Sequence, residues 1–256
     1  MITPSTSSSI PVLIAWNTPR LAHGFLGRLG GVSVGPYESL NLAYWVGDDS
    51  AHVDANWRRL REVIGNDPIA RCRQVHGKSV RIVTRENIAA KPEGDGMVTA
   101  EPGILLAVAS ADCVPILMVD ERCEIVAAIH AGWRGVIAGI AEEGVRAMEN
   151  LGARPGEIRA ALGPSIGQCC FEVDQELADR FAREVAGSER HSRPGRIGKS
   201  HLDLRAIVTD QLVRSGLPRE SITNVGPCTK CAEDRFFSRR AEASSGLQVS
   251  FIGIRA

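Results

Sequence analysis

Residues 104–135 read ILLAVASADCVPILMVDERCEIVAAIHAGWRG. This stretch contains three near-continuous apolar runs, at 104–109, 114–119 and 124–129, separated by short polar segments. Runs of this length, rich in Val, Ile and Leu, predict strands that are buried on both faces. A sheet buried on both faces needs another layer against each side, so the stretch predicts a layered fold.

Further strands and helices are predicted on both sides of this stretch. Short apolar runs predict strands at 12–14, 71–75, 80–83, 158–162 and 249–254. Apolar residues at helical spacing, with capping residues and glycine stops, predict helices at 50–64, about 134–151, 173–185 and about 204–215. We therefore expect an α+β fold, a layered α/β sandwich with mixed sheets.

The chain has no stretch of linker composition that would divide it. Residues 1–11 are rich in Ser and Thr and are expected to form a flexible lead-in, and residues 12–256 a single domain. The segment 186–199, rich in Gly, Ser, Arg and Pro, is expected to be a surface loop, because the helical patterns on both sides are short and need a shared core.

Composition excludes several classes of function. Of the 256 residues, 30 are Lys or Arg and 30 are Asp or Glu, so the formal net charge is zero. Proteins that hold nucleic acid or anionic membranes carry a basic excess, and we expect neither partner. The longest apolar run is far shorter than the roughly 20 residues of a membrane span. Seven cysteines, an odd number, and the lack of a signal-peptide pattern favour reduced thiols and a cytoplasmic location.

Cys113 and His130 flank the hairpin expected from 113–130. If the hairpin turns at Glu121 and Arg122, Cys113 lies directly opposite His130, where side chains are about 5 Å apart and can share a zinc ion. His76, at the end of the predicted strand before Gly77, is the natural third ligand, leaving one position open for water or substrate. The alternative is a buried Cys113 and a hydrogen-bonded His130 without a metal.

Other polar residues give weaker indications. Arg28 and Arg134 lie among glycines, where backbone N–H groups can approach an anion, or they are ordinary surface arginines. Cys228 and Cys231 form a single CxxC without a second pair, and Cys169 and Cys170 are adjacent rather than spaced as ligands. We expect these four cysteines to be free thiols.

Several segments, in this order, resemble the YfiH family of laccase-domain or polyphenol-oxidase-like proteins, now described as purine nucleoside phosphorylases. The segments are GRLGGVSVGPYESLNL, VGDD, QVHG, DGMVT, ADCVPILMVD, IHAGWRG, LGPSIG, FEV, LDLR, CT and RFFS, within residues 25–240. The resemblance implies an α-β-β-α sandwich and a metal site made of His76, Cys113 and His130. It also implies that Arg28 and Asn41 line the substrate cleft.

The resemblance implies a zinc enzyme that phosphorolyses adenosine, inosine and methylthioadenosine, with adenosine deamination as a second activity. Its partners would be a purine nucleoside and phosphate, with Arg28 and Arg134 as candidate anion binders, and the protein would be a monomer or a homodimer. Departures from the family pattern affect the expected substrate preference. They are Gly27 before Arg28, Trp45, Phe171, Arg239 and Leu247.

Two other enzyme classes use the same residues. A copper-dependent polyphenol oxidase would add Met97 or Met118 as a weak axial ligand, but such oxidases need many more histidines than the six present. A cysteine hydrolase that edits peptidoglycan precursors would use Cys113 as nucleophile and His130 as base. A binding module without catalysis is disfavoured, because no basic, aromatic or repetitive surface pattern exists.

Overall fold

The hairpin of β7 (Val114–Asp120) and β8 (Ile125–Ala131) forms the centre of a six-stranded sheet. The structure is a computed structural model and describes residues 10–256. Every residue of the two strands is buried, as the continuous apolar runs predicted. The antiparallel register runs from Val114 opposite Ala131 to Asp120 opposite Ile125.

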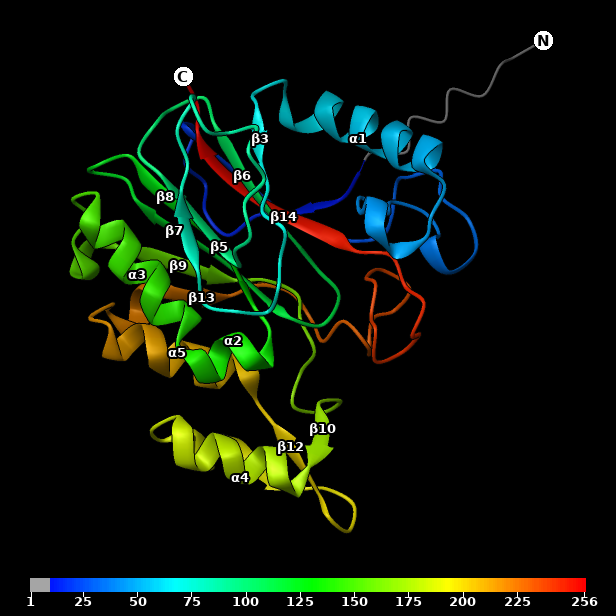
Figure 1. The fold of residues 1–256 in the computed structure, drawn as a ribbon, viewed down its shortest axis with the longest axis vertical. Helices are drawn as coiled ribbons and strands as arrows, with labels where there is room; N and C mark the ends of the chain where they lie inside the picture. Colours follow the sequence, from blue (N-terminus) through cyan, green and yellow to red (C-terminus); the bar gives the residue numbers. More distant parts are fainter. Residues whose placement is uncertain (1–9) are drawn as a thin grey trace.

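Within residues 10–256 the strands form three sheets, of which the two large ones are mixed and the small one is antiparallel (Figure 1). The six-stranded sheet has the order β13 (Ile222–Asn224), β9 (Arg159–Leu162), β7, β8, β5 (Gly96–Thr99) and β4 (Val80–Ile82). The five-stranded sheet has the order β1 (Val12–Leu13), β2 (Leu21–Leu26), β14 (Gln248–Ile254), β6 (Leu105–Ser110) and β3 (Ile69–Ala70). The three-stranded sheet has the order β10 (Glu172–Asp174), β12 (Lys199–Leu202) and β11 (Ser192–Pro194).

The two large sheets pack face to face and each is covered by helices on its other side. Alternate residues of β7 face opposite ways: Leu117 packs between the sheets, whereas Met118 packs against the helices. On β6, likewise, Leu106 lies between the sheets and Leu105 contacts the cluster that includes Leu60 of α1. The predicted α-β-β-α sandwich is confirmed.

The described part of the chain forms five α-helices, and four of them supply the outer layers of the sandwich. The five are α1 (Ser50–Ile64), α2 (Trp133–Ala138), α3 (Ile140–Asn150), α4 (Gln175–Glu184) and α5 (Leu204–Arg214). Helix α1 covers the five-stranded sheet, while α2, α3 and α5 cover the six-stranded sheet (Figure 1). Helix α4 packs on the three-stranded sheet, which projects from the rest of the molecule (Figure 1).

The prediction of one continuous helix over 134–151 is wrong. The chain forms two helices, α2 and α3, joined at Gly139, which has a left-handed φ of 86°. Because glycine adopts this conformation without a steric penalty, the helix ends there and a new one starts in another direction. Val173, assigned to the third helix, lies instead in β10.

The predicted hairpin turn is also wrong. The loop between β7 and β8 comprises the four residues 121–124, not two, and Asp120 accepts a hydrogen bond from the backbone N–H of Arg122 at its start. The register is therefore shifted by two residues, and His130 lies opposite Pro115 rather than opposite Cys113. A shift of two residues keeps each side chain on its predicted face of the sheet.

Other predictions differ at the margins of the fold. Residues 71–75 are not a strand; the short β3 precedes them. The segment 186–199 contains a 3-10 turn and β11 instead of being wholly irregular. Of the predicted lead-in, 1–9 lies outside the described residues, whereas Ile10 is buried. Within the described part of the chain, no helix has both the length and the apolar character to cross a bilayer.

Candidate metal centre

Three side chains meet where loops leave the six-stranded sheet. His76 lies ahead of β4, Cys113 directly before β7, and His130 near the end of β8. Their candidate ligand atoms all lie within 4.8 Å of one another. The two imidazole rings are 4.8 Å apart between centroids and nearly perpendicular, with an interplanar angle of 80°. Cys113 and His130 are thus brought together diagonally across the hairpin.

The carboxylate of Asp95 orients two of these residues. Its carboxylate is fully buried and accepts a hydrogen bond from His130 Nδ1 at 2.9 Å. It also accepts hydrogen bonds from the backbone N–H groups of His76 at 2.9 Å and Gly77 at 2.7 Å. Because a carboxylate only accepts, Nδ1 of His130 donates its N–H to Asp95, and Nε2 is the nitrogen that can bind a metal once the metal displaces any proton there. The same carboxylate fixes the turn at His76, whose φ is 60°.

The electrostatics of the centre favour a charged pair. Burial alone would raise the pKa of the Cys113 thiol, but the charge and hydrogen bonds of His130 and His76 lower that pKa to about 6. Burial would lower the pKa of His130, but Cys113 and Asp95 raise it to about 9. Hydrogen bonds to Asp95 outweigh its burial and lower its pKa. At neutral pH these values make Cys113 a thiolate, the form that binds metals or attacks electrophiles.

The space around the three side chains fits a metal site. Gly132 lies against them: a Cβ added there would lie 2.8 Å from Cδ2 of His76 and 3.2 Å from Sγ of Cys113. A glycine is therefore required for the three side chains to converge. Two imidazoles and one thiolate are typical ligands of zinc, and three protein ligands leave one coordination position open. The residues present fit a catalytic metal ion.

A second aspartate holds the loop that carries Cys113. Asp112 has a left-handed φ of 85°, unusual for a residue other than glycine. Its carboxylate accepts hydrogen bonds from Oγ1 of Thr229 at 2.6 Å and from the backbone N–H of Arg240 at 2.7 Å. Its backbone carbonyl accepts one from Ile166. The position of Cys113 thus depends on segments far away in the sequence.

The structure places the three other predicted site residues apart from the ligands' hydrogen-bond network. Arg28 donates to the backbone carbonyls of Glu38 and Glu233, and its guanidinium stacks on Phe237 at 4.8 Å. Asn41 is fully buried and its amide is hydrogen-bonded on both sides within the protein. Roles for Arg28 and Asn41 in the substrate cleft stay predictions.

Arg134 lies four residues after His130 in the sequence. It is exposed at the start of α2, two residues after Gly132, with its guanidinium 4.4 Å from the ring of Trp133. Among the three predicted anion or substrate residues it is the one closest in the chain to a candidate ligand. Its role as an anion binder also stays a prediction.

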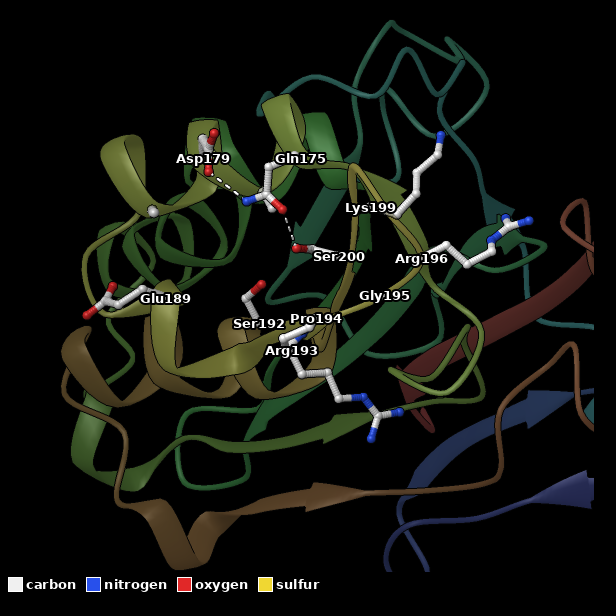
Figure 2. Close-up of a pocket in the computed structure, with 12 residues that line it drawn as sticks. Gln175, Asp179, Glu189, Ser192, Arg193, Pro194, Gly195, Arg196, Lys199 and Ser200 are labelled. Carbon is white, nitrogen blue, oxygen red and sulfur yellow. Dashed lines mark hydrogen bonds between the residues drawn. The ribbon is translucent and has the colours of Figure 1, made fainter.

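Two cavities differ in what they offer a substrate. One, of about 470 Å³, lies between α4 and the β11–β12 hairpin and is lined by Arg193, Arg196 and Lys199 (Figure 2). Glu172 and Asp174 form ion pairs with Arg196 and Lys199, so much of its positive charge is neutralised. The cavity belongs to the projecting three-stranded unit and contains no candidate ligand.

A larger cavity lies beside the segment that leads to His76. It has a volume of about 590 Å³ and a mostly apolar lining that includes Tyr44, Trp45, Arg71 and Gln74. Trp45 is 61% exposed, which is unusual for a tryptophan, and Arg71 stacks on Tyr44 at 5.9 Å. Gln74 also exchanges two hydrogen bonds with the backbone of Ala109. This cavity has the size of a small-molecule site.

Sequence reasoning missed Asp95 and Asp112 as functional residues. Asp95 was noted only within DGMVT, although an aspartate just before a buried strand is a position where sites form. Asp112 adjoins Cys113, but only the fold shows that it bonds to residues more than 100 positions away.

A family model described as "Multi-copper polyphenol oxidoreductase laccase" matches residues 22–255. The chain belongs to this family. A relative named purine nucleoside phosphorylase YlmD, from Geobacillus stearothermophilus, is 38% identical over 91% of this chain and 89% of its own. Its crystal structure superposes with a TM-score of 0.88, at 36% identity and with 93% of each chain covered.

Two further relatives carry related names. A protein of Shigella flexneri named purine nucleoside phosphorylase YfiH is 38% identical and covers 88% of this chain and 90% of its own. A protein from an unknown prokaryotic organism, named adenosine deaminase RL5, is 37% identical and covers 85% and 87%. The resemblance to the YfiH family is therefore confirmed.

Proposed function

We propose that the protein is a zinc-dependent purine nucleoside phosphorylase that acts on adenosine, inosine and methylthioadenosine. The observation that carries the proposal is the convergence of His76, Cys113 and His130 within 4.8 Å, oriented by a buried carboxylate. The names of the relatives support this choice of reaction over others that the same three residues could perform.

In the proposed reaction an oxygen of phosphate attacks C1′ of the ribose. The bond from C1′ to the purine nitrogen breaks, and the purine leaves with the electron pair and takes up a proton. The products are ribose 1-phosphate and the free base. When bound, zinc would supply a Lewis acid that polarises an oxygen ligand and favours its deprotonated form.

The protein's own residues prepare this chemistry. Asp95 holds the proton on Nδ1 of His130 and so keeps Nε2 directed at the site. Cys113 enters as a thiolate, since its pKa is lowered to about 6. Arg134 would attract phosphate to the edge of the site, as an exposed cation two residues beyond Gly132.

We place the nucleoside in the cavity lined by Tyr44, Trp45, Arg71 and Gln74. Its volume of about 590 Å³ accommodates a nucleoside, and its lining leads along the chain to His76. An exposed indole offers a face on which a purine can stack. Trp45, a departure from the family pattern, would then affect which purine is preferred.

Incubation of the purified protein with adenosine or inosine, with and without phosphate, tests the proposal. We expect free base and ribose 1-phosphate only when phosphate is present. Cys113→Ala serves as the matched control for contaminating enzymes. Absence of both products for every nucleoside, with zinc bound, would refute phosphorolysis.

Adenosine deamination is a second candidate, because one relative is named an adenosine deaminase. Water would attack C6 of adenine and ammonia would leave, giving inosine without any requirement for phosphate. The same incubation distinguishes the two reactions: inosine and ammonia formed from adenosine without phosphate indicate deamination.

The copper oxidase and the cysteine hydrolase receive less support. Met97 and Met118 pack in separate core clusters, and the described residues hold no histidine-rich group that would bind a copper cluster. The thiolate of Cys113 beside His130 does suit a nucleophile. A covalent adduct on Cys113 trapped during turnover would favour the hydrolase, whereas zinc retained on purification favours the phosphorylase.

We also propose a reducing, cytoplasmic location, since none of the seven cysteines forms a disulfide and all of them lie in the described part of the chain.

A further inference from the structure

A second cluster of metal-binding side chains lies outside the proposed active site. Cys169, Cys170, Cys228 and Cys231 have sulfur atoms that all lie within 4.8 Å of one another. Sγ of Cys231 is 3.6 Å from that of Cys169 and 3.4 Å from that of Cys170. The adjacent pair and the CxxC, which in sequence lacked partners, are therefore partners of each other.

The fold brings the two pairs together through backbone contacts and one arginine. Ser165 and Cys228 form an isolated parallel bridge, and the N–H of Thr229 donates to the carbonyl of Ser165 at 3.0 Å. Arg205 of α5 donates to Ser165 on one side and to the carbonyls of Gly226 and Pro227 on the other. The cluster is thus anchored on both sides by groups other than its own thiols.

A tight turn lets both adjacent cysteines face the same point. The N–H groups of Cys170 and Phe171 both donate to the carbonyl of Gly167 at 3.0 Å. Gly167 itself leaves room for the cluster, because a Cβ added there would lie 3.2 Å from Cβ of Cys228 and 3.3 Å from Sγ of Cys169.

The distances fit a tetrahedral metal site. With Zn–S bonds of about 2.3 Å, the sulfur atoms of a four-cysteine site are about 3.8 Å apart. The separations of 3.4 and 3.6 Å are close to this value, and all four sulfur atoms lie within 4.8 Å of one another. A disulfide would need a sulfur separation of about 2.05 Å, and all four cysteines are free. Arg205 donates to the carbonyls of Gly226 and Pro227, directly before Cys228, so its positive charge lies near the cluster and offsets part of the net negative charge of four thiolates around one Zn²⁺.

We propose that Cys169, Cys170, Cys228 and Cys231 bind a second zinc ion, which is structural. Four protein ligands leave no position for substrate, as in other structural zinc sites. The ion joins the segment 163–170 to the segment 226–231. Thr229 and Ile166 of these segments bind Asp112, the residue before Cys113. The second ion therefore braces the loop that carries the candidate catalytic cysteine.

Metal analysis of protein prepared with reductant from zinc-replete medium tests this proposal. We expect about two zinc ions per chain in the unaltered protein and about one in Cys113→Ala. The double variant Cys228→Ala/Cys231→Ala should also hold about one. Cys123→Ala is the matched control, because Cys123 is an exposed thiol outside both clusters, and it should keep about two.

X-ray absorption at the zinc edge of Cys113→Ala identifies the ligands of the remaining ion. We expect sulfur ligands only, at about 2.3 Å. This measurement does not depend on whether the double variant folds. Absence of zinc from Cys113→Ala, nitrogen ligands around the remaining ion, or disulfides among these cysteines in reduced protein would each overturn the proposal. None of these outcomes bears on nucleoside turnover, which is tested separately.

Discussion

Cys113 is the residue on which the proposed activity depends most directly. Cys113→Ala removes one of three ligands and the negative charge that holds the cation. We expect loss of zinc from the His76–Cys113–His130 site and at least a hundredfold loss of activity, about 2.7 kcal/mol of transition-state stabilisation. Zinc analysis and steady-state kinetics check both effects. Near-normal turnover with that site still loaded would contradict the ligand assignment.

Asp95 should matter almost as much, although it touches no substrate. In Asp95→Asn the side chain loses its charge and one acceptor oxygen, so it no longer satisfies both His130 and the turn at His76. Loss of such an orienting carboxylate lowers metal affinity about 10–100-fold. Competition with a chromophoric chelator measures the change. Asp179→Asn, at an exposed position of α4 far from the centre in sequence, is the control and should leave affinity unchanged.

A substitution at Gly132 changes the space available to the three candidate ligands without removing any of them. The Gly132 backbone, with φ of −74° and ψ of 161°, allows any residue, so Gly132→Ala acts through the added methyl group alone. That group would lie 2.8 Å from the His76 ring and must displace it. We expect metal affinity to fall on the order of tenfold while the fold is retained. Gly156→Ala, where the methyl group meets nothing, is the control.

At the scale of elements, prediction succeeded where both ends of an element carry a signal. Helix α1 was predicted correctly because Asp49 caps it and Gly65 ends it. The helix at 134–151 was not divided, because the apolar spacing continues across Gly139 and a single glycine does not reveal its φ. Strand β2, LAHGFL, was missed because Ala, His and Gly have little preference for strands.

Helix α5 is tied to its surroundings through one acidic residue. Asp210 forms ion pairs with Arg190, His191 and Arg219, and its side chain is only 14% exposed. Burial alone would raise its pKa, but these partners lower it from 3.8 to about 2. Because the folded-state pKa is depressed, the stabilisation is present above about pH 4 and is lost as the pH falls towards 2.

Asp210→Asn should therefore reduce the free energy of unfolding by about 1–2 kcal/mol at pH 7. Urea denaturation at several pH values measures the difference from the unaltered protein, which should shrink below pH 4. Glu184→Gln removes an exposed pair with Arg180 on α4 and should change stability little. A difference for Asp210→Asn that stayed constant down to pH 2 would contradict the ion-pair explanation.

At the scale of the whole molecule, the layers could be predicted but the site only in part. Continuous apolar runs indicate strands covered on both faces, which is the information needed for a sandwich. The three ligands could be proposed because Cys113 and His130 flank one local hairpin. The four-cysteine group could not be proposed from the sequence. Its two pairs lie about 60 residues apart, and contacts made by Ser165 and Arg205 bring them together in the fold.

The projecting unit of α4, β10, β11 and β12 should open more easily than the central sheets. Its three strands pair only with one another, and in Figure 1 it extends away from the sandwich. We expect amide hydrogen exchange in α4 to require less free energy than exchange in β7 and β8, which follows global unfolding. Equal values for α4 and the central strands would show that the molecule opens as one unit.

Strand β14 lies between β2 and β6, although it follows both in the chain by more than 130 residues. During synthesis, the six-stranded sheet with its metal ligands is complete once β13 has emerged, whereas the five-stranded sheet must wait for β14. Until then β2 and β6 have free edges, and the apolar face that Phe25 and Leu106 line is not closed. We therefore expect a nascent chain that stalls before residue 248 to aggregate more readily than the full chain and to depend more on chaperones.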